Sequence, residues 1–65
     1  MKYDFVLDGK YMQELSRKSR YALLQSNAGL YYIYELFSWG YGYCVDTFVS
    51  SDVALYALEY NEIYN

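Results

Sequence analysis

The sequence predicts an α+β fold, in which a small antiparallel β-sheet of four to five strands carries one C-terminal α-helix packed on it. β-like runs alternate with turn residues up to residue 49, and a Ser-Ser-Asp helix start follows the last run. Aromatic residues make up 23% of the 65 residues, so large rings can supply the buried area that a short chain needs. We expect residues 1–65 to form a single small domain.

The first two strands are expected to form a hairpin. Residues 2–7 alternate in polarity as a half-buried strand does, and residues 10–15 would return beside them. Asp8-Gly9 lies between the two runs, and this pair is typical of a type I′ hairpin turn, which needs positive φ at both positions. A short helix over residues 10–18 is the alternative for the second segment.

A basic, polar connector (16–20) leads to a third strand at residues 21–25. The turn at 26–29 contains an Asn and a Gly that favour left-handed backbone conformations. The clearest strand spans residues 30–37, and both of its faces are apolar or aromatic, which is typical of a central strand. We expect the helix to cover one face and a partner or solvated tyrosines to cover the other. One face carries Leu30, Tyr32, Tyr34 and Leu36; the other carries Tyr31, Ile33, Glu35 and Phe37.

A turn with two glycines at 38–42 precedes a fifth strand at 43–49. The helix is expected from about residue 52 to residue 60, with a serine cap and an acid in its first turn. A step of about 100° per residue places three acids within an arc of about 80°. These acids are Asp52, Glu59 and Glu62. The same geometry predicts a core-facing stripe of Val53, Ala57, Tyr60 and Tyr64.

The charges are divided unevenly along the chain. Residues 1–20 carry all five bases and three acids, a net charge of +2, while residues 21–65 carry five acids and no base, a net charge of −5. Nine of the eleven tyrosines also lie in the second part. We therefore predict an uncompensated acidic, tyrosine-rich surface, which repels nucleic acid and attracts basic proteins.

The partner-binding residues predicted from this pattern are acids and aromatic residues of the second part. They are Glu35, Asp46, Asp52, Glu59, Glu62, Trp39, Tyr41 and Tyr60. Tyrosine offers a large rigid contact area and a hydroxyl, which favours interfaces. Core packing is the alternative role for the tyrosines around the central strands.

No group of residues predicts an enzyme. The chain lacks His, the usual general base near neutral pH, and its single cysteine, Cys44, is expected to be a buried structural thiol. No cofactor or metal is expected. Residues 1–15 lack the apolar core of a signal peptide, and the apolar run at 30–37 is too short to span a membrane. These features predict a cytoplasmic protein.

In size, acidity, aromatic richness and absence of catalytic groups, the chain resembles the small acidic proteins that phages carry against host defence. These include anti-CRISPR, antirestriction and uracil-DNA glycosylase inhibitor proteins. The resemblance implies a protein that occupies a nucleic-acid-binding surface with carboxylates placed where phosphates would lie, in the cytoplasm of the host cell.

Three functions follow as hypotheses. The first is a non-catalytic, anti-CRISPR-like inhibitor whose acidic, tyrosine-rich face binds a basic nucleic-acid-binding protein, such as a CRISPR effector or a restriction or nuclease component, and blocks DNA or RNA binding. The second is an immunity protein or antitoxin that neutralises a basic nuclease. The third is a self-assembling structural protein, in which tyrosine-rich faces cover each other in a homodimer.

Overall fold

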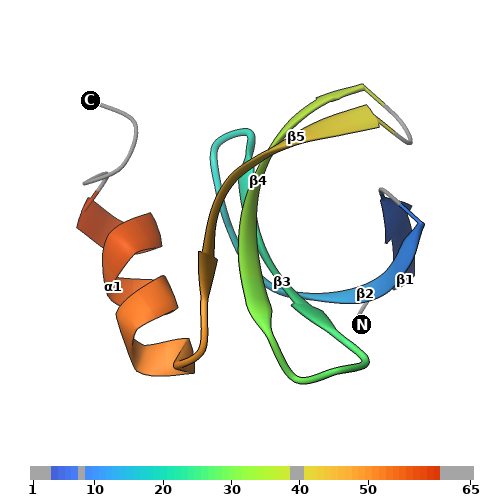
Figure 1. Cartoon of the computed structure of the whole chain (residues 1–65). Coiled ribbons are helices and arrows are strands. Elements are labelled where there is room, and N and C mark those ends of the chain that lie inside the picture. Colours follow the sequence, from blue (N-terminus) through green and yellow to red (C-terminus); the bar gives the residue numbers. More distant parts are fainter. Residues whose placement is uncertain (1–3, 8, 39–40, 61–65) are drawn as a thin grey trace.

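The protein consists of a curled five-stranded antiparallel sheet and one helix. The computed structural model describes residues 4–7, 9–38 and 41–60, with side chains described for 6–7, 9–37 and 42–60. The elements are β1 (Asp4–Leu7), β2 (Lys10–Lys18), β3 (Tyr21–Ser26), β4 (Tyr31–Ser38), β5 (Tyr41–Phe48) and α1 (Ser51–Tyr60). The strands follow chain order in the sheet, and every neighbouring pair is antiparallel. The predicted α+β fold is confirmed, whereas the strong curl of the sheet into a half-barrel was not expected (Figure 1).

The strand boundaries differ from the prediction mainly at the basic connector. Residues 10–18 form one long strand rather than a helix, so the predicted connector shrinks to a tight turn in which Ser19 has a φ of 57°. In the next turn Gly29 adopts the left-handed conformation, with a φ of 86°, but Asn27 does not. β5 begins at Tyr41, so the part of the predicted glycine turn that is described belongs to a strand.

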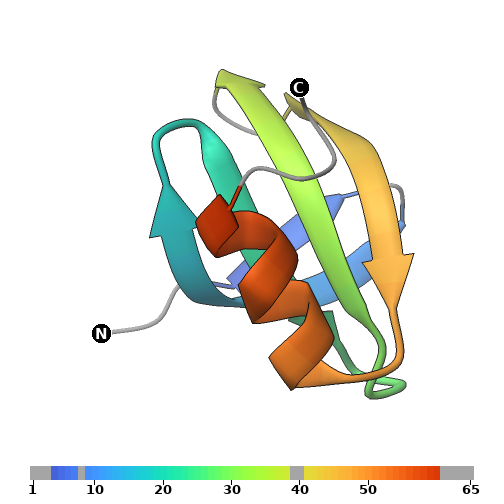
Figure 2. The ribbon, with the colours of Figure 1, turned by 90° about the vertical axis from the view of Figure 1, so that its left-hand side faces the viewer.

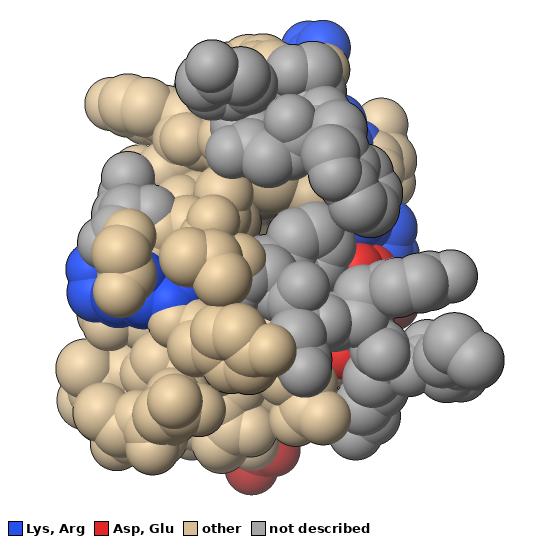
Figure 3. All heavy atoms as spheres, turned by 90° about the vertical axis from the view of Figure 1, so that its right-hand side faces the viewer, with Lys and Arg blue, Asp and Glu red and all other residues tan. Residues whose placement is uncertain are grey.

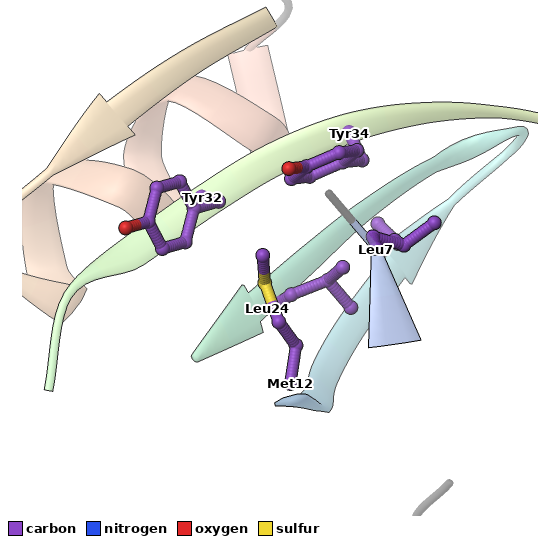
Figure 4. Close-up of a cluster of buried hydrophobic side chains, with 6 residues drawn as sticks. Leu7, Met12, Leu24, Tyr32 and Tyr34 are labelled. Carbon is purple, nitrogen blue, oxygen red and sulfur yellow. The ribbon is translucent and has the colours of Figure 1, made fainter. Parts of the chain in front are cut away.

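A first hydrophobic core fills the concave side of the sheet. The residues at its centre come from four strands, and Figure 4 labels Leu7, Met12, Leu24, Tyr32 and Tyr34 among them. Tyr34 is only 1% exposed, and its ring meets that of Tyr32 edge-on at 6.3 Å between centroids. The prediction that a partner or solvent covers this face of the central strand was wrong, because the sheet curls over its own tyrosines.

Bulges help the sheet to curl. The pairing register shifts between Glu14 and Ser16 in β2, and again at two places along the β4–β5 pair. Each bulge bends the strand that carries it and increases the local twist. Close packing also requires a glycine in β5, since a Cβ at Gly42 would lie 2.8 Å from Leu36 Cδ2 and 3.1 Å from Tyr34 Cδ2.

A second core lies between the convex side of the sheet and α1, which crosses the sheet diagonally (Figure 2). The helix packs mainly on β3 and β4, with β2 and β5 at its margins. Its first turn closes where the amide of Ala54 donates to the carbonyl of Ser50, which makes Ser50 the capping residue. In the described residues, no helix has the length and hydropathy needed to cross a membrane.

The predicted core-facing stripe of α1 was largely wrong. The buried helix residues are Ala54, Ala57 and Leu58, whereas Val53 and Tyr60 are exposed; Tyr64 lies outside the described residues. Small alanines let the helix lie close to the sheet, and neighbouring rings such as Tyr31 and Phe48 fill the space beside them. The helix is therefore rotated relative to the prediction, and large side chains point outward.

Candidate protein-binding surface

The described bases are all engaged within the molecule. Lys10 lies over the ring of Tyr32, with Nζ 5.6 Å from the ring centroid. The other three bases come from the β2–β3 turn and the strand that leads into it, and each bonds to a carboxylate or a carbonyl. The positive charge of the first twenty residues is therefore largely committed to internal contacts.

The bulge in β2 brings Arg17 and Glu14 together. Residues three apart on a regular strand point to opposite faces, but the bulge places Glu14 and Arg17 opposite Leu24 and Ala22, which share the concave face. Arg17 donates from Nε and Nη2 to the two carboxylate oxygens of Glu14, each at 3.0 Å. These hydrogen bonds raise the pKa of Arg17 above its ordinary value.

Two longer-range contacts join the basic turn to the acidic part of the chain. Arg20 Nε lies 2.8 Å from Glu35 Oε2, and Lys18 Nζ donates to the main-chain carbonyl of Glu59 in the last turn of α1. A cation at this end of a helix satisfies a carbonyl that has no intrahelical donor and complements the helix dipole. The prediction that the acids of residues 21–65 are uncompensated was therefore wrong for Glu35, which is paired with Arg20. At the last turn of α1, Lys18 supplies a cation.

The remaining predicted acids have different surroundings. Asp46 is half-buried on β5, and its carboxylate accepts a hydrogen bond from the amide of Thr47 at 2.8 Å. Asp52 and Glu59 are both exposed on α1, and neither carboxylate forms an ion pair with a described residue. Glu62 lies outside the described residues.

Asp52 and Glu59 point away from the sheet on the same side of α1. They lie about 20° apart around the helix axis and about 10 Å apart along it. The buried residues Ala54, Ala57 and Leu58 occupy the opposite side. The predicted acidic arc is thus solvent-facing for its two described members.

Exposed apolar side chains surround these two acids. Val53 is 56% exposed and Tyr60 is 64% exposed, and Leu55 and Tyr56 are exposed beside them. The rings of Tyr56 and Tyr60 contact each other, with centroids 4.7 Å apart and planes at 48°. We call this surface the outer face of α1; it consists of Asp52, Val53, Leu55, Tyr56, Glu59 and Tyr60.

The structure brings together three of the predicted partner-binding residues, Asp52, Glu59 and Tyr60, on the outer face of α1. Glu35 and Asp46 lie on the sheet instead. Trp39 and the side chain of Tyr41 lie outside the described part. Sequence reasoning missed Tyr56 and Val53 as surface residues, whereas Leu55 falls inside the predicted acidic arc. The signal that could have found them was the pair of alanines at 54 and 57, which marks the side on which the helix packs closely.

The tyrosines divide into buried and exposed groups. Tyr32 and Tyr34 belong to the concave core, and Tyr31 is half-buried and accepts a hydrogen bond from Gln25 Nε2 at 3.2 Å. Tyr11, Tyr43, Tyr56 and Tyr60 are exposed. Among the described tyrosines, only Tyr56 and Tyr60 lie beside two exposed carboxylates.

Cys44 is half-buried rather than fully buried. It packs against the concave core, and its thiol contacts the carbonyl of Asp46 at 3.7 Å and the hydroxyl of Thr47 at 3.9 Å. Neither neighbour is a base that would generate a thiolate. Within the described residues, no group of three potential ligands could hold a metal ion.

The side of the molecule opposite α1 has a different character. Its described surface is mostly uncharged, with basic atoms at the margins and only small areas of acidic atoms (Figure 3). The outer face of α1, seen from the front in Figure 2, is therefore the better candidate for an acidic contact surface. Comparisons with protein-family models, curated proteins and solved structures found no match.

Proposed function

We propose that this protein is a non-catalytic inhibitor that binds a basic nucleic-acid-binding protein through the outer face of α1 and blocks its DNA or RNA binding. In this role it acts like the anti-CRISPR and antirestriction proteins that it resembles in size and composition. The target's Lys and Arg side chains, which would otherwise meet phosphates, meet the carboxylates of Asp52 and Glu59. Tyr56, Tyr60, Val53 and Leu55 supply apolar contact area around them.

The observation that carries the proposal is the combination of two carboxylates that form no ion pair with a described residue and four exposed apolar side chains on one short helix. Large exposed apolar patches that are mixed with polar groups mark interaction sites. Three of the four described bases bond to carboxylates or rings away from this face, and Lys18 binds the main-chain carbonyl of Glu59 rather than its carboxylate. Complementary charge steers a basic partner to the face and makes the association sensitive to salt.

The same charges disfavour self-association through this face. In a two-fold pair of antiparallel α1 helices, Asp52 of one copy would approach Glu59 of the other, because the two acids share the outer side of α1 and lie near its opposite ends. Like charges at close range oppose such a pairing, while a basic partner removes the repulsion. A homodimer through α1 is therefore less favourable than a complex with a basic protein.

The test is an affinity capture with the tagged protein from a lysate of the cells in which it acts, at low and at high salt. We expect a basic nucleic-acid-binding protein to be retained at low salt and released at high salt. The purified target should then lose its binding to DNA or RNA when the inhibitor is added. Identification of the target as a defence effector or as a toxin nuclease distinguishes an inhibitor from an immunity protein.

Two outcomes would contradict the proposal. One is a captured partner that still binds its nucleic acid when saturated with the protein. The other is a stable homodimer in light scattering that persists in high salt and captures no basic protein, which would favour the structural role.

A further inference from the structure

Tyr56, one of the two rings on the outer face of α1, lies between two carboxylates along the helix. Asp52 precedes Tyr56 by four residues, and Glu59 follows it by three. Residues three and four apart are neighbours on a helix surface, with Cβ atoms about 5–6 Å apart. The Tyr56 ring contacts the Tyr60 ring at 4.7 Å, and both rings are more than half exposed. A single side chain of a partner can thus contact a tyrosine ring and a carboxylate oxygen at the same time.

Arginine and lysine differ in how they use such a surface. The guanidinium group is planar and weakly hydrated, so it can stack on a tyrosine ring while it donates two hydrogen bonds to a carboxylate. The ammonium group of lysine is a compact, strongly hydrated charge that gains less from the ring. A surface of bare carboxylates would accept either cation, whereas the adjoining tyrosine pair favours arginine.

The carboxylates inside this protein pair with arginine. Both described carboxylates in ion pairs are bound by arginine, in the pairs Arg17–Glu14 and Arg20–Glu35. Lys18, the last residue of β2, bonds to a main-chain carbonyl instead, and Lys10 lies over the ring of Tyr32. We infer that the outer face of α1 selects an arginine-bearing segment of the target protein over a lysine-bearing one. This inference rests on the proposed function and specifies the chemistry of the partner.

The test uses the full chain, labelled with ¹⁵N, and two simple probes: nona-arginine and nona-lysine peptides, titrated separately at the same ionic strength. We expect nona-arginine to bind about two- to five-fold more tightly than nona-lysine, which corresponds to the 0.5–1 kcal/mol of an exposed cation–π contact. The amide shifts caused by nona-arginine should centre on residues 52–60.

A double variant separates the rings from the charge. Tyr56→Leu with Tyr60→Leu keeps an apolar surface and both carboxylates, so we expect the affinity for nona-arginine to fall more than the affinity for nona-lysine and the preference for arginine to disappear. Tyr43→Leu is the matched control, since Tyr43 and Tyr60 are each 64% exposed but Tyr43 lies on β5. This control should keep the preference. If the amide spectrum shows that the double variant is unfolded, Tyr60→Leu alone carries the test.

Equal affinities of the wild-type protein for the two peptides would overturn the inference, and so would a preference that survives in the double variant. If both peptides bind residues 52–60 with equal, salt-sensitive affinity, only the selection of arginine is overturned, and the proposed function stands. Binding of neither peptide would also overturn the inference, while the capture experiment decides independently whether a basic target exists.

Discussion

Two tyrosine pairs show how the same residue type serves two purposes in this chain. Tyr32 and Tyr34 lie in the concave core, with Tyr34 almost completely buried, while the tilted rings of Tyr56 and Tyr60 contact each other on the solvent side of α1. The first pair adds large buried rings to the aliphatic side chains of the concave core, and the second pair offers rigid contact area beside exposed acids. A high tyrosine content is therefore not by itself a sign of binding; the neighbouring residues decide the role.

The largest expected effect is a difference in the free energy of unfolding between a variant of the buried pair and a variant of the exposed pair. Tyr34→Ala removes a buried ring and should lower the free energy of unfolding by about 3–5 kcal/mol, which is a large share of the total stability of a small domain. Tyr60→Ala should lower it by about 1 kcal/mol or less, because its ring is mostly solvated. Urea titration followed by circular dichroism measures both. Similar losses for the two variants would break the distinction between a structural pair and a surface pair.

A smaller effect is expected where β5 approaches the buried pair. Gly42→Ala introduces a Cβ within 3.1 Å of Tyr34 Cδ2 and 2.8 Å of Leu36 Cδ2, so both side chains must shift. We expect a loss of about 1–3 kcal/mol in the free energy of unfolding. The same titration checks it, with Gly29→Asn as a comparison that meets no neighbouring atom and tolerates the left-handed backbone. An unchanged stability of Gly42→Ala would show that the concave core is loosely packed.

The smallest effect concerns the support of the exposed pair. Lys18→Met keeps the aliphatic stem but removes the donor to the carbonyl of Glu59, and it should destabilise the protein by about 0.3–1 kcal/mol. Hydrogen exchange of the amides in the last turn of α1 should accelerate more than exchange in β3 and β4. Uniform acceleration throughout the protein would instead show that Lys18 acts on global stability and not on the end of the helix.

Local signals predicted the strands well and long-range geometry poorly. The two-sided apolar pattern at 30–37 identified the central strand, and the Asp-Gly pair identified the first hairpin. The curl of the sheet depends on bulges and accumulated twist, which no local run displays. It is the curl that covers Tyr32 and Tyr34.

The candidate site was predicted in part, for similar reasons. The arc of Asp52 and Glu59 follows from helical geometry alone. The rotation of the helix does not, because close packing on the sheet favoured Ala54 and Ala57 over larger apolar side chains. The contact between Lys18 and Glu59 joins residues 41 positions apart, so no local pattern indicated that the end of β2 meets the end of α1.

The most direct test of the proposed binding face is a comparison of two double variants that change the net charge equally. Asp52→Asn with Glu59→Gln removes the two unpaired acids of α1, and Glu14→Gln with Glu35→Gln removes the two acids that are paired with arginines. Their dissociation constants for the captured basic target are measured at one salt concentration. Binding through the outer face of α1 predicts a loss of at least about tenfold for the first variant and less than about threefold for the second. Equal losses, or no loss in the first variant, would contradict it, because net charge or another surface would then govern binding.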